Sequence, residues 1–259
     1  MKIYYICRIA IAPLRKEPSD RSEIVSQLLF GDRVTVLEQT EKWWRVKSEH
    51  DSYEGWLDFK QLQNISAVQF DDNNNYRFVA PTQLNNTLIA ADRTKYYLGA
   101  GSTLPFYNNG YCEVGDQKFE LAFEPVLPDS SSFKANVGET ALFFQNTPYL
   151  WGGRTLFGID CSGFVQLVYK LNGLQLQRDA SQQAEQGNLV DFLASAQVGD
   201  LAFFDNEEGK IIHVGLMLGN DQIIHSAGKV RIDRIDDQGI YNAELGRYTH
   251  KLRIIKQFV

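Results

Sequence analysis

Residues 149–173 constrain the fold of this chain more than any other stretch. They begin with aromatic residues and glycines, which suit a tight loop, and then change to a helical pattern that Gly173 ends. The apolar positions of that pattern recur on one side of a helix: Phe164, Val165, Val168 and Leu171. We expect the helix to begin at Asp160-Cys161-Ser162, with Cys161 in its first turn.

A thiol in the first turn of a helix faces unpaired backbone N–H groups and the positive end of the helix dipole, which favour an anion. The sequence therefore predicts a lowered pKa for Cys161 and a larger share of nucleophilic thiolate. The alternative is a small buried core residue, the commoner role of a single cysteine. This stretch alone leaves both interpretations open.

Two of the four histidines lie on either side of a predicted β-hairpin. His213 falls in Lys210–Leu218, and His225 falls in Gln222–Ser226. A three-residue loop at Gly219–Asp221 would place both histidines on one side of the sheet, as diagonal cross-strand neighbours. A two-residue turn would put them on opposite faces.

A thiol at a helix start, a histidine on a strand and a further polar group to orient it are the parts of a thiol hydrolase. Each histidine by itself could also be a hydrogen-bonded core or surface residue. A zinc site at the histidine pair is not favoured, because the sequence has no His-Glu-x-x-His and no second cysteine nearby. We therefore predict no metal and no cofactor.

Charge and cysteine content limit the classes of partner and the covalent links that we expect. The 259 residues carry a net charge of −6, which gives no reason to expect nucleic acid or an anionic membrane surface. The three cysteines are far apart, so they build no disulfide framework. Arg8 interrupts the first apolar run, so we expect a first strand through Ile9, Ile11 and Leu14 in place of a signal sequence, and a cytoplasmic protein, unless a signal was removed from the precursor.

The chain divides into three predicted domains. Residues 1–64 contain short apolar runs separated by turn clusters, and Gly31-Asp32-x-Val34 and Trp43-Trp44-x-Val46 resemble a bacterial SH3-like barrel. Residues 65–128 suggest a second, diverged barrel of the same kind. Residues 129–259 predict helices followed by an antiparallel sheet, an α+β domain.

Several motifs together resemble the NlpC-type, papain-like cell-wall peptidases. They are Tyr149-x-Trp151-Gly152-Gly153, Asp160-Cys161-Ser162-Gly163, Arg178-Asp179-Ala180-Ser181-x-Gln183, Gly199-Asp200-Leu201, His213-Val214-Gly215 and His225-Ser226. The β-rich first half resembles a subgroup with paired SH3-like barrels before the catalytic domain. The resemblance implies two SH3-like barrels followed by an α+β papain-like cysteine peptidase domain.

The resemblance also assigns roles. It implies Cys161 as nucleophile, His213 as general base and acid, and His225 as the residue that orients His213. Further residues would line the substrate groove: Tyr149, Asp160, Ser162, Asp179 and Ser181, with Glu17 and Tyr53 from the first barrel. For Asp179 and Ser181 helix capping is the rival explanation. For Glu17 it is a solvated loop carboxylate, and for Tyr149 an ordinary loop aromatic.

The implied activity is hydrolysis of the bond between γ-D-Glu and a diamino acid, diaminopimelate or lysine, in peptidoglycan-derived peptides with a free N-terminal L-Ala. A cytoplasmic monomer that recycles wall peptides is the expectation. Two alternatives are a non-catalytic peptidoglycan-binding protein and a related Cys–His amidase that acts on another wall amide.

Overall fold

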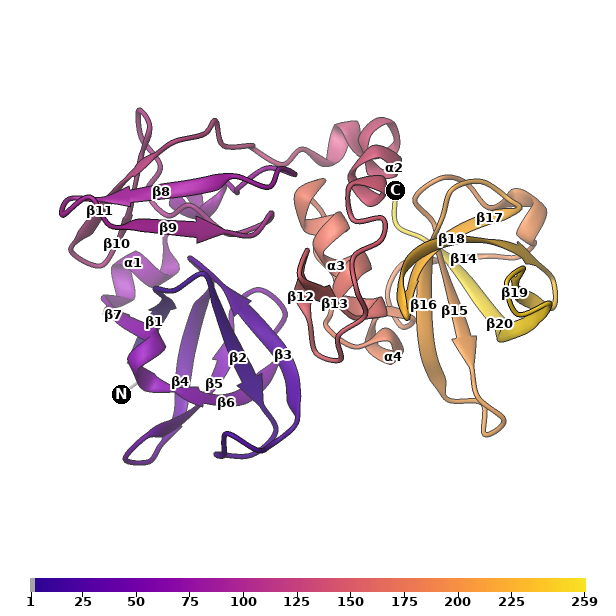
Figure 1. Cartoon of the computed structure of the whole chain (residues 1–259), viewed down its shortest axis with the longest axis horizontal. Helices are drawn as coiled ribbons and strands as arrows, with labels where there is room; N and C mark the ends of the chain where they lie inside the picture. Colours follow the sequence, from indigo (N-terminus) through magenta and orange to yellow (C-terminus); the bar gives the residue numbers. More distant parts are fainter. Residues whose placement is uncertain (1–2) are drawn as a thin grey trace. The chain divides into compact units, whose positions relative to one another are not determined.

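The computed structural model describes residues 3–259, and the chain forms two compact units. The first unit consists of Met1–Pro128 together with Trp151–Thr155, and the second of Asp129–Leu150 together with Leu156–Val259. Figure 1 labels the elements of both. Nowhere in residues 3–259 is a helix long and apolar enough to cross a membrane.

The beginning of the first unit is a seven-stranded antiparallel sheet in the order β3-β2-β6-β5-β4-β1-β7. Its strands are β1 (Ile3–Cys7), β2 (Ile11–Arg15), β3 (Ile24–Leu29), β4 (Arg33–Gln39), β5 (Trp43–Ser48), β6 (Glu54–Asp58) and β7 (Leu62–Ile65). The sequence predicts only one strand before residue 20, whereas the structure has two. The run Ile3–Cys7 is rich in β-branched and aromatic residues, which favour a strand, and it pairs with both β4 and β7.

The rest of the first unit contains α1 (Ala67–Asp71) and a four-stranded sheet in the order β10-β11-β8-β9. Its strands are β8 (Asn86–Ala90), β9 (Lys95–Leu98), β10 (Tyr111–Val114) and β11 (Gln117–Leu121). Residues 99–110 form turns with isolated bridges, and φ is positive at Gly101, Phe106 and Asn109. This part of the unit has a four-stranded sheet, and its description as a second SH3-like barrel stays a proposal.

The second unit begins with helices. They are α2 (Phe133–Phe143), α3 (Cys161–Leu171) and α4 (Ala180–Gln183), with the two-residue strand β13 (Gly158–Ile159) before α3. The other two-residue strand, β12 (Arg154–Thr155), belongs to the first unit. Helix α3 begins and ends where the sequence predicts, and Gly173 beyond it has a φ of +79°. All of its residues except Lys170 are buried, so α3 is a central helix covered on every side and not only along one stripe.

The second unit ends in an antiparallel sheet in the order β14-β20-β15-β16-β17-β18-β19. Its strands are β14 (Asn188–Val190), β15 (Leu201–Asp205), β16 (Ile211–Met217), β17 (Gln222–Ala227), β18 (Lys229–Asp236), β19 (Gly239–Asn242) and β20 (Arg247–Gln257). Because β20 also pairs with β19, the strands β15 to β20 close into a six-stranded barrel. The predicted order of helices and then antiparallel strands is present, but strands dominate and the sheet is closed.

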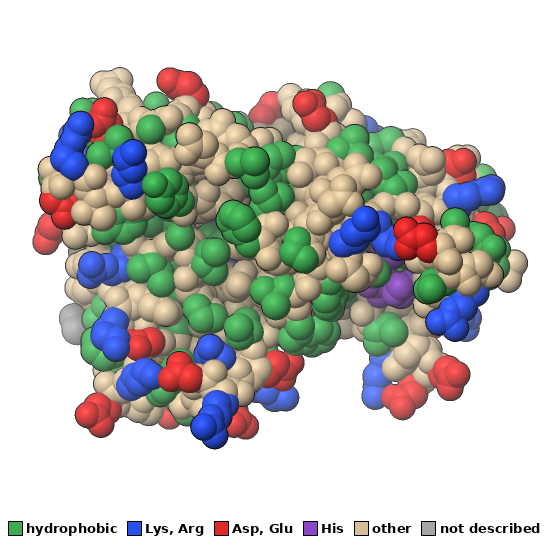
Figure 2. Space-filling model, viewed as in Figure 1, with side chains coloured by type: hydrophobic (Ala, Val, Ile, Leu, Met, Phe, Trp, Pro, Cys, Tyr) green, Lys and Arg blue, Asp and Glu red, His purple; other side chains and the backbone are tan. Residues whose placement is uncertain are grey.

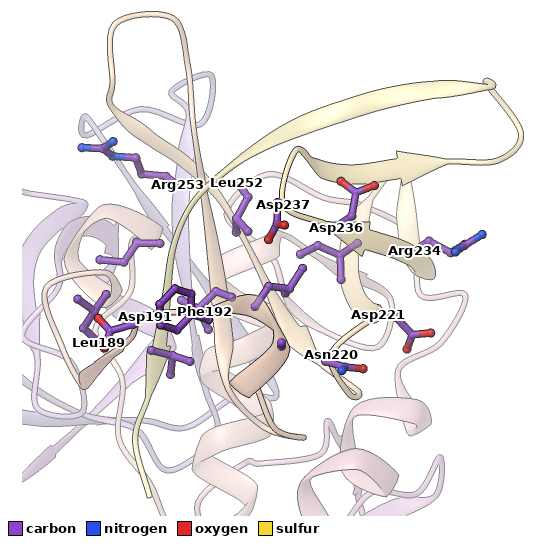
Figure 3. A pocket seen from close by; sticks show the side chains of 16 residues that line it. Leu189, Asp191, Phe192, Asn220, Asp221, Arg234, Asp236, Asp237, Leu252 and Arg253 are labelled. Atoms are coloured by element: carbon purple, nitrogen blue, oxygen red, sulfur yellow. The ribbon is translucent and has the colours of Figure 1, made fainter.

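A pocket of about 640 Å³ lies between residues 189–194 and the strands β18 and β20 (Figure 3). Its lining includes the exposed Phe192, and the carboxylates of Asp221, Asp236 and Asp237. None of the predicted site residues lines this pocket. The pocket is therefore separate from the predicted active site. On the face that Figure 2 shows, basic and acidic side chains of the described residues are interspersed.

Candidate active site

The predicted nucleophile is held at the start of the central helix. Cys161 is the first residue of α3, and the carboxylate of the preceding Asp160 accepts a hydrogen bond of 2.7 Å from the Gly163 backbone N–H. The backbone N–H groups of Val214 and Ser162 donate to the thiol. Because Val214 directly follows His213 on β16, and α3 packs against β16, the thiol lies beside the strand that carries the predicted base.

The prediction of a lowered thiol pKa is wrong for the unliganded protein. Burial raises the pKa of Cys161 to about 12, and the negative charge of Asp160 adds to the rise. The two backbone N–H groups and the charge of Arg178 act in the opposite direction but do not outweigh burial. With its residue only 8% exposed, Cys161 rests as a neutral thiol at neutral pH.

Alkylation of Cys161 should therefore depend steeply on pH. A thiol with so high a pKa gains thiolate about tenfold per pH unit, so the rate with iodoacetamide should climb from pH 6 to pH 9 with no plateau. Mass spectrometry of the Cys161 peptide measures this rate, with a model peptide thiol as the reference. A plateau below pH 9 would show instead that a thiolate forms near neutrality. Cys7 and Cys112, fully buried, should stay unlabelled.

The two histidines of the hairpin meet as the three-residue loop predicts. Gly215 pairs with His225 and Leu218 with Gln222, which leaves Gly219–Asp221 as the loop. His213 and His225 therefore lie on the same face, and Nε2 of His213 is 2.8 Å from Nδ1 of His225. Both side chains are buried. The geometry provides the orienting contact that the sequence predicts between them.

A carboxylate on β18 extends this chain of contacts. Nε2 of His225 is 3.0 Å from Oδ2 of Asp233, and Arg231 donates to both oxygens of Asp233 at 2.7 and 2.9 Å. Burial alone would raise the pKa of Asp233, but hydrogen bonds from His225 and Arg231 outweigh it and lower that pKa. Asp233 is therefore an ionised acceptor.

The ionised Asp233 determines the position of the protons. Because a carboxylate can only accept, His225 donates from Nε2, and its Nδ1 is left to accept from Nε2–H of His213. The remaining nitrogen of His213, Nδ1, then carries a lone pair. Burial and the neighbouring His225 and His250 hold the pKa of His213 well below its usual value, so the ring is neutral. A neutral imidazole with a bare nitrogen is a general base.

Both oxygens of Asp160 are engaged by a buried arginine. Arg178 donates to Oδ1 at 3.0 Å and to Oδ2 at 2.6 Å, and it also donates to the Ser162 hydroxyl at 2.8 Å. Only 1% of the Arg178 side chain is exposed. The two residues that flank Cys161 are thus fixed by one guanidinium, which gives Asp160 and Ser162 a structural role beside any contact with substrate.

The other predicted residues of the second unit surround this centre. Tyr149 is half-buried, and burial, followed by the charges of Cys161 and Asp160, raises its pKa to about 12, which places it near the thiol. Asp179 forms a capping box with Gln182 at the start of α4. This is the helix-capping role that the sequence offered as the alternative to substrate binding. Ser181 is exposed and lines a separate pocket with Glu185 and Lys210.

The two predicted residues of the first unit lie in loops beside strands. Glu17 is exposed after β2, and its backbone N–H donates to the Ser22 hydroxyl at 2.9 Å. Tyr53 is half-buried just before β6. Their role at the substrate groove remains a prediction.

His213, His225 and His250 offer nitrogens that all lie within 4.8 Å of one another, a grouping that could hold a metal ion. The ring planes of His213 and His250 are stacked at 23°, so their in-plane lone pairs run nearly parallel and do not converge on one point. The 2.8 Å between His213 and His225 is also shorter than the spacing of about 3.3 Å between two nitrogens on a tetrahedral zinc. The cluster fits hydrogen-bonded imidazoles better than a metal ion.

Sequence reasoning did not assign a role to Asp233, His250 or Arg178 in this centre. Asp233 lies in an alternating run on β18, where a buried acid among apolar neighbours is the pattern that could have identified it. Arg178 belongs to the recognised motif at 178–183, but its partner Asp160 is distant in sequence. His250 lies on β20, and no local pattern links it to His213.

Comparisons of the sequence and of the fold with known proteins identify two domains in this chain. The NlpC/P60 family profile matches residues 146–248, and the profile of the bacterial dipeptidyl-peptidase Sh3 domain matches residues 14–62. A solved NlpC/P60 family protein from Bacillus cereus ATCC 10987 has the same fold, with a TM-score of 0.79 at 20% identity over 99% of both chains.

Several curated relatives match over most of this chain. The gamma-D-glutamyl-L-lysine dipeptidyl-peptidase of Bacillus subtilis (strain 168) is 31% identical over 227 residues, which cover 78% of this chain and 72% of that protein. The dipeptidyl-peptidase 6 of Lysinibacillus sphaericus is 26% identical over 254 residues, covering 88% and 90%. The chain therefore belongs to the NlpC/P60 family, with a bacterial SH3-like domain ahead of its NlpC/P60 domain.

Proposed function

We propose that this protein is a cysteine peptidase that hydrolyses the bond between γ-D-Glu and a diamino acid in peptidoglycan-derived peptides. The observation that carries the proposal is the thiol of Cys161 at the start of α3, beside a strand whose His213 is linked through His225 to Asp233. The B. subtilis relative named for γ-D-glutamyl-L-lysine supports the substrate class.

The proposed reaction uses one base twice. Sγ of Cys161 attacks the γ-carbonyl carbon of D-Glu while its proton passes to Nδ1 of His213. The C–N bond then breaks, and His213 returns the proton to the leaving amine of the diamino acid. Water attacks the resulting thioester with His213 again as base, which releases the γ-carboxylate and restores the thiol. The backbone N–H of Cys161 is the proposed donor to the oxyanion.

We propose further that the substrate presents a free N-terminal L-Ala. An ammonium group requires acceptors, and Asp179 is a half-exposed carboxylate in the recognised motif. Asp160 and Ser162, on either side of Cys161, are proposed as further acceptors, and Arg178 fixes the position of both. Tyr149 and Ser181 are proposed as further lining residues, and Glu17 and Tyr53 as the wall supplied by the first unit.

The finer domain description is also a proposal. It consists of an SH3-like barrel at residues 1–64, a diverged second barrel at 65–128 and a papain-like catalytic domain at 129–259. A monomer that acts in the cytoplasm on recycled wall peptides remains a prediction from the sequence.

The free amine should decide which peptides are cleaved. The protein should hydrolyse L-Ala-γ-D-Glu-diaminopimelate, whereas kcat/KM for the N-acetylated peptide should fall about 100-fold or more, since a site built to bind a polar group rejects an analogue that lacks it. Mass spectrometry of the products measures both reactions and distinguishes cleavage at the γ-D-Glu bond from cleavage of another wall amide.

A pair of matched variants tests whether Asp179 causes the discrimination between the free and the acetylated peptide. Asp179→Asn should reduce the discrimination between the two peptides, whereas Asp191→Asn, at an exposed aspartate of the pocket in Figure 3, should leave it intact. Equal cleavage of the free and acetylated peptides would contradict the free-amine requirement. If neither peptide is cleaved but the protein sediments with peptidoglycan, the chain is a binding protein and the peptidase assignment is wrong.

A further inference from the structure

The ring of His250 lies flat against the ring of His213. The two centroids are 4.1 Å apart and the planes are inclined by 23°, a stacked contact. His250 is on β20, opposite Ile240 of β19, and its Nδ1 is 2.9 Å from the Thr249 hydroxyl. The proposed reaction gives this side chain no part.

The contact supplies a restraint that the hydrogen bond to His225 lacks. His225 meets His213 edge-on, with ring planes at 84° and a single nitrogen–nitrogen contact of 2.8 Å. One such contact restrains one nitrogen but leaves the ring free to tilt about it, because the last torsion of a histidine side chain has a broad energy minimum. A ring stacked on the face of His213 removes that tilt.

His250 also belongs to a cluster of three rings that contains the base. Phe204 lies 5.7 Å from the His213 ring and 5.9 Å from the His250 ring, so the three rings pack together inside the barrel of β15 to β20. His213 is only 5% exposed in this arrangement. His250 is partly exposed and is the least buried of the three rings.

We propose that His250 is a positioning residue, whose ring clamps the face of His213 and shields it, so that Nδ1 keeps the direction that the proposed proton transfer from Cys161 requires. The inference rests on the proposed peptidase function for its effect on catalysis, but the clamp itself is a property of the folded protein. The property that matters is the flat ring and not the nitrogens, because the contact with His213 is made by stacking.

The surroundings of His213 determine how the clamp acts on its protonation. The groups whose charges act on His213 are His225 on β17 and His250 on β20. Other titratable or charged groups on the elements around it include Cys161 on α3, Asp179 at the start of α4, Asp205 on β15, and Arg231 and Asp233 on β18. Burial is the main cause of the low pKa of His213, followed by His225 and His250. Loss of the His250 ring would admit water and remove one of these neighbours, so the pKa of His213 would rise.

The test compares His250→Ala with His250→Phe. Alanine removes the stacked ring, so kcat should fall about 10- to 100-fold through misplacement of the base, with little change in KM. The acid limb of the kcat/KM profile should move to higher pH, because a base with a raised pKa becomes protonated, and inactive, at higher pH. Phenylalanine keeps a flat ring that excludes water, so it should restore most of kcat. The acid limb should then lie closer to that of the wild type than in His250→Ala, since only the charge of His250 is lost.

A titration that needs no turnover separates this inference from the peptidase assignment. The chain has four histidines, so NMR of ¹⁵N-labelled histidine can follow His213 directly. His250→Ala should raise the pKa of His213 clearly more than His250→Phe, because phenylalanine keeps the ring and the burial and removes only the charge that His250 can carry. If the wild-type protein cleaves nothing but the titration shifts as expected, the clamp stands and the peptidase assignment fails. An unchanged titration and kcat in His250→Ala, or equal damage in both variants, would overturn the clamp.

Discussion

Replacing Cys161 with alanine should abolish peptide hydrolysis, with kcat/KM reduced roughly 10⁴-fold or more, as in other enzymes that lose their nucleophile. The proposed thioester cannot form without Sγ, and the water that His213 would activate in the second step then has no thioester to attack. Steady-state cleavage of L-Ala-γ-D-Glu-diaminopimelate, followed by mass spectrometry, measures the loss. The substitution is small and stays within α3, so the fold should persist and the peptide should still bind.

A second cysteine provides the matched control. Cys112 is fully buried on β10 in the first unit, and Cys112→Ala should retain the wild-type kcat. Retention of activity by Cys112→Ala together with its loss in Cys161→Ala assigns the chemistry to one thiol. Activity near the wild-type level in Cys161→Ala would contradict the nucleophile assignment, whatever the products.

The position of a site residue could be predicted from the sequence where it is determined by the helix or hairpin that carries the residue. The Asp160 cap, the start of α3 at Cys161 and its stop near Gly173 follow from helix signals within fifteen residues. That His213 and His225 lie on the same face follows from the alternation of side chains along a strand and from the three-residue length of the loop between them. Each of these features is decided by neighbours in sequence, so each could be predicted.

Features that depend on closure of the sheet could not be predicted in this way. His250 reaches His213 only because β20 pairs with both β15 and β19, and a register shift between Ile240 and Tyr241 lies beside that contact. The same holds for the protonation of Cys161. The sequence shows a helix start, which lowers a thiol pKa, but it does not show the burial that raises the pKa to about 12.

Replacing Arg178 with methionine should destabilise the second unit by about 3–5 kcal/mol, the usual cost of leaving a buried charge without its partner. Arg178 donates to both oxygens of Asp160 and to Ser162, and the arginine and the carboxylate are almost entirely buried. Without the guanidinium, the negative charge of Asp160 beside Cys161 loses the cation that engages both of its oxygens. Activity should fall as well, because the residues on either side of the nucleophile lose their anchor.

The placement of the tryptophans allows the measurement to resolve the two units. The chain has four tryptophans, at positions 43, 44, 56 and 151, and all of them belong to the first unit. During urea unfolding, tryptophan fluorescence therefore follows the first unit, while hydrogen exchange in the peptides of α3 follows the second. Arg178→Met should reduce protection in α3 and leave the fluorescence midpoint nearly unchanged.

A double variant distinguishes an unpaired charge from lost packing. Asp160→Asn retains an oxygen that can cap α3 but removes the charge, so combining it with Arg178→Met should recover part of the lost stability. Lys42→Met breaks an exposed ion pair with Asp20 and should leave stability unchanged, as a control for removal of a cation. If the double variant is as unstable as Arg178→Met alone, the cost comes from packing of the arginine side chain, and the pair does not hold the nucleophile by charge.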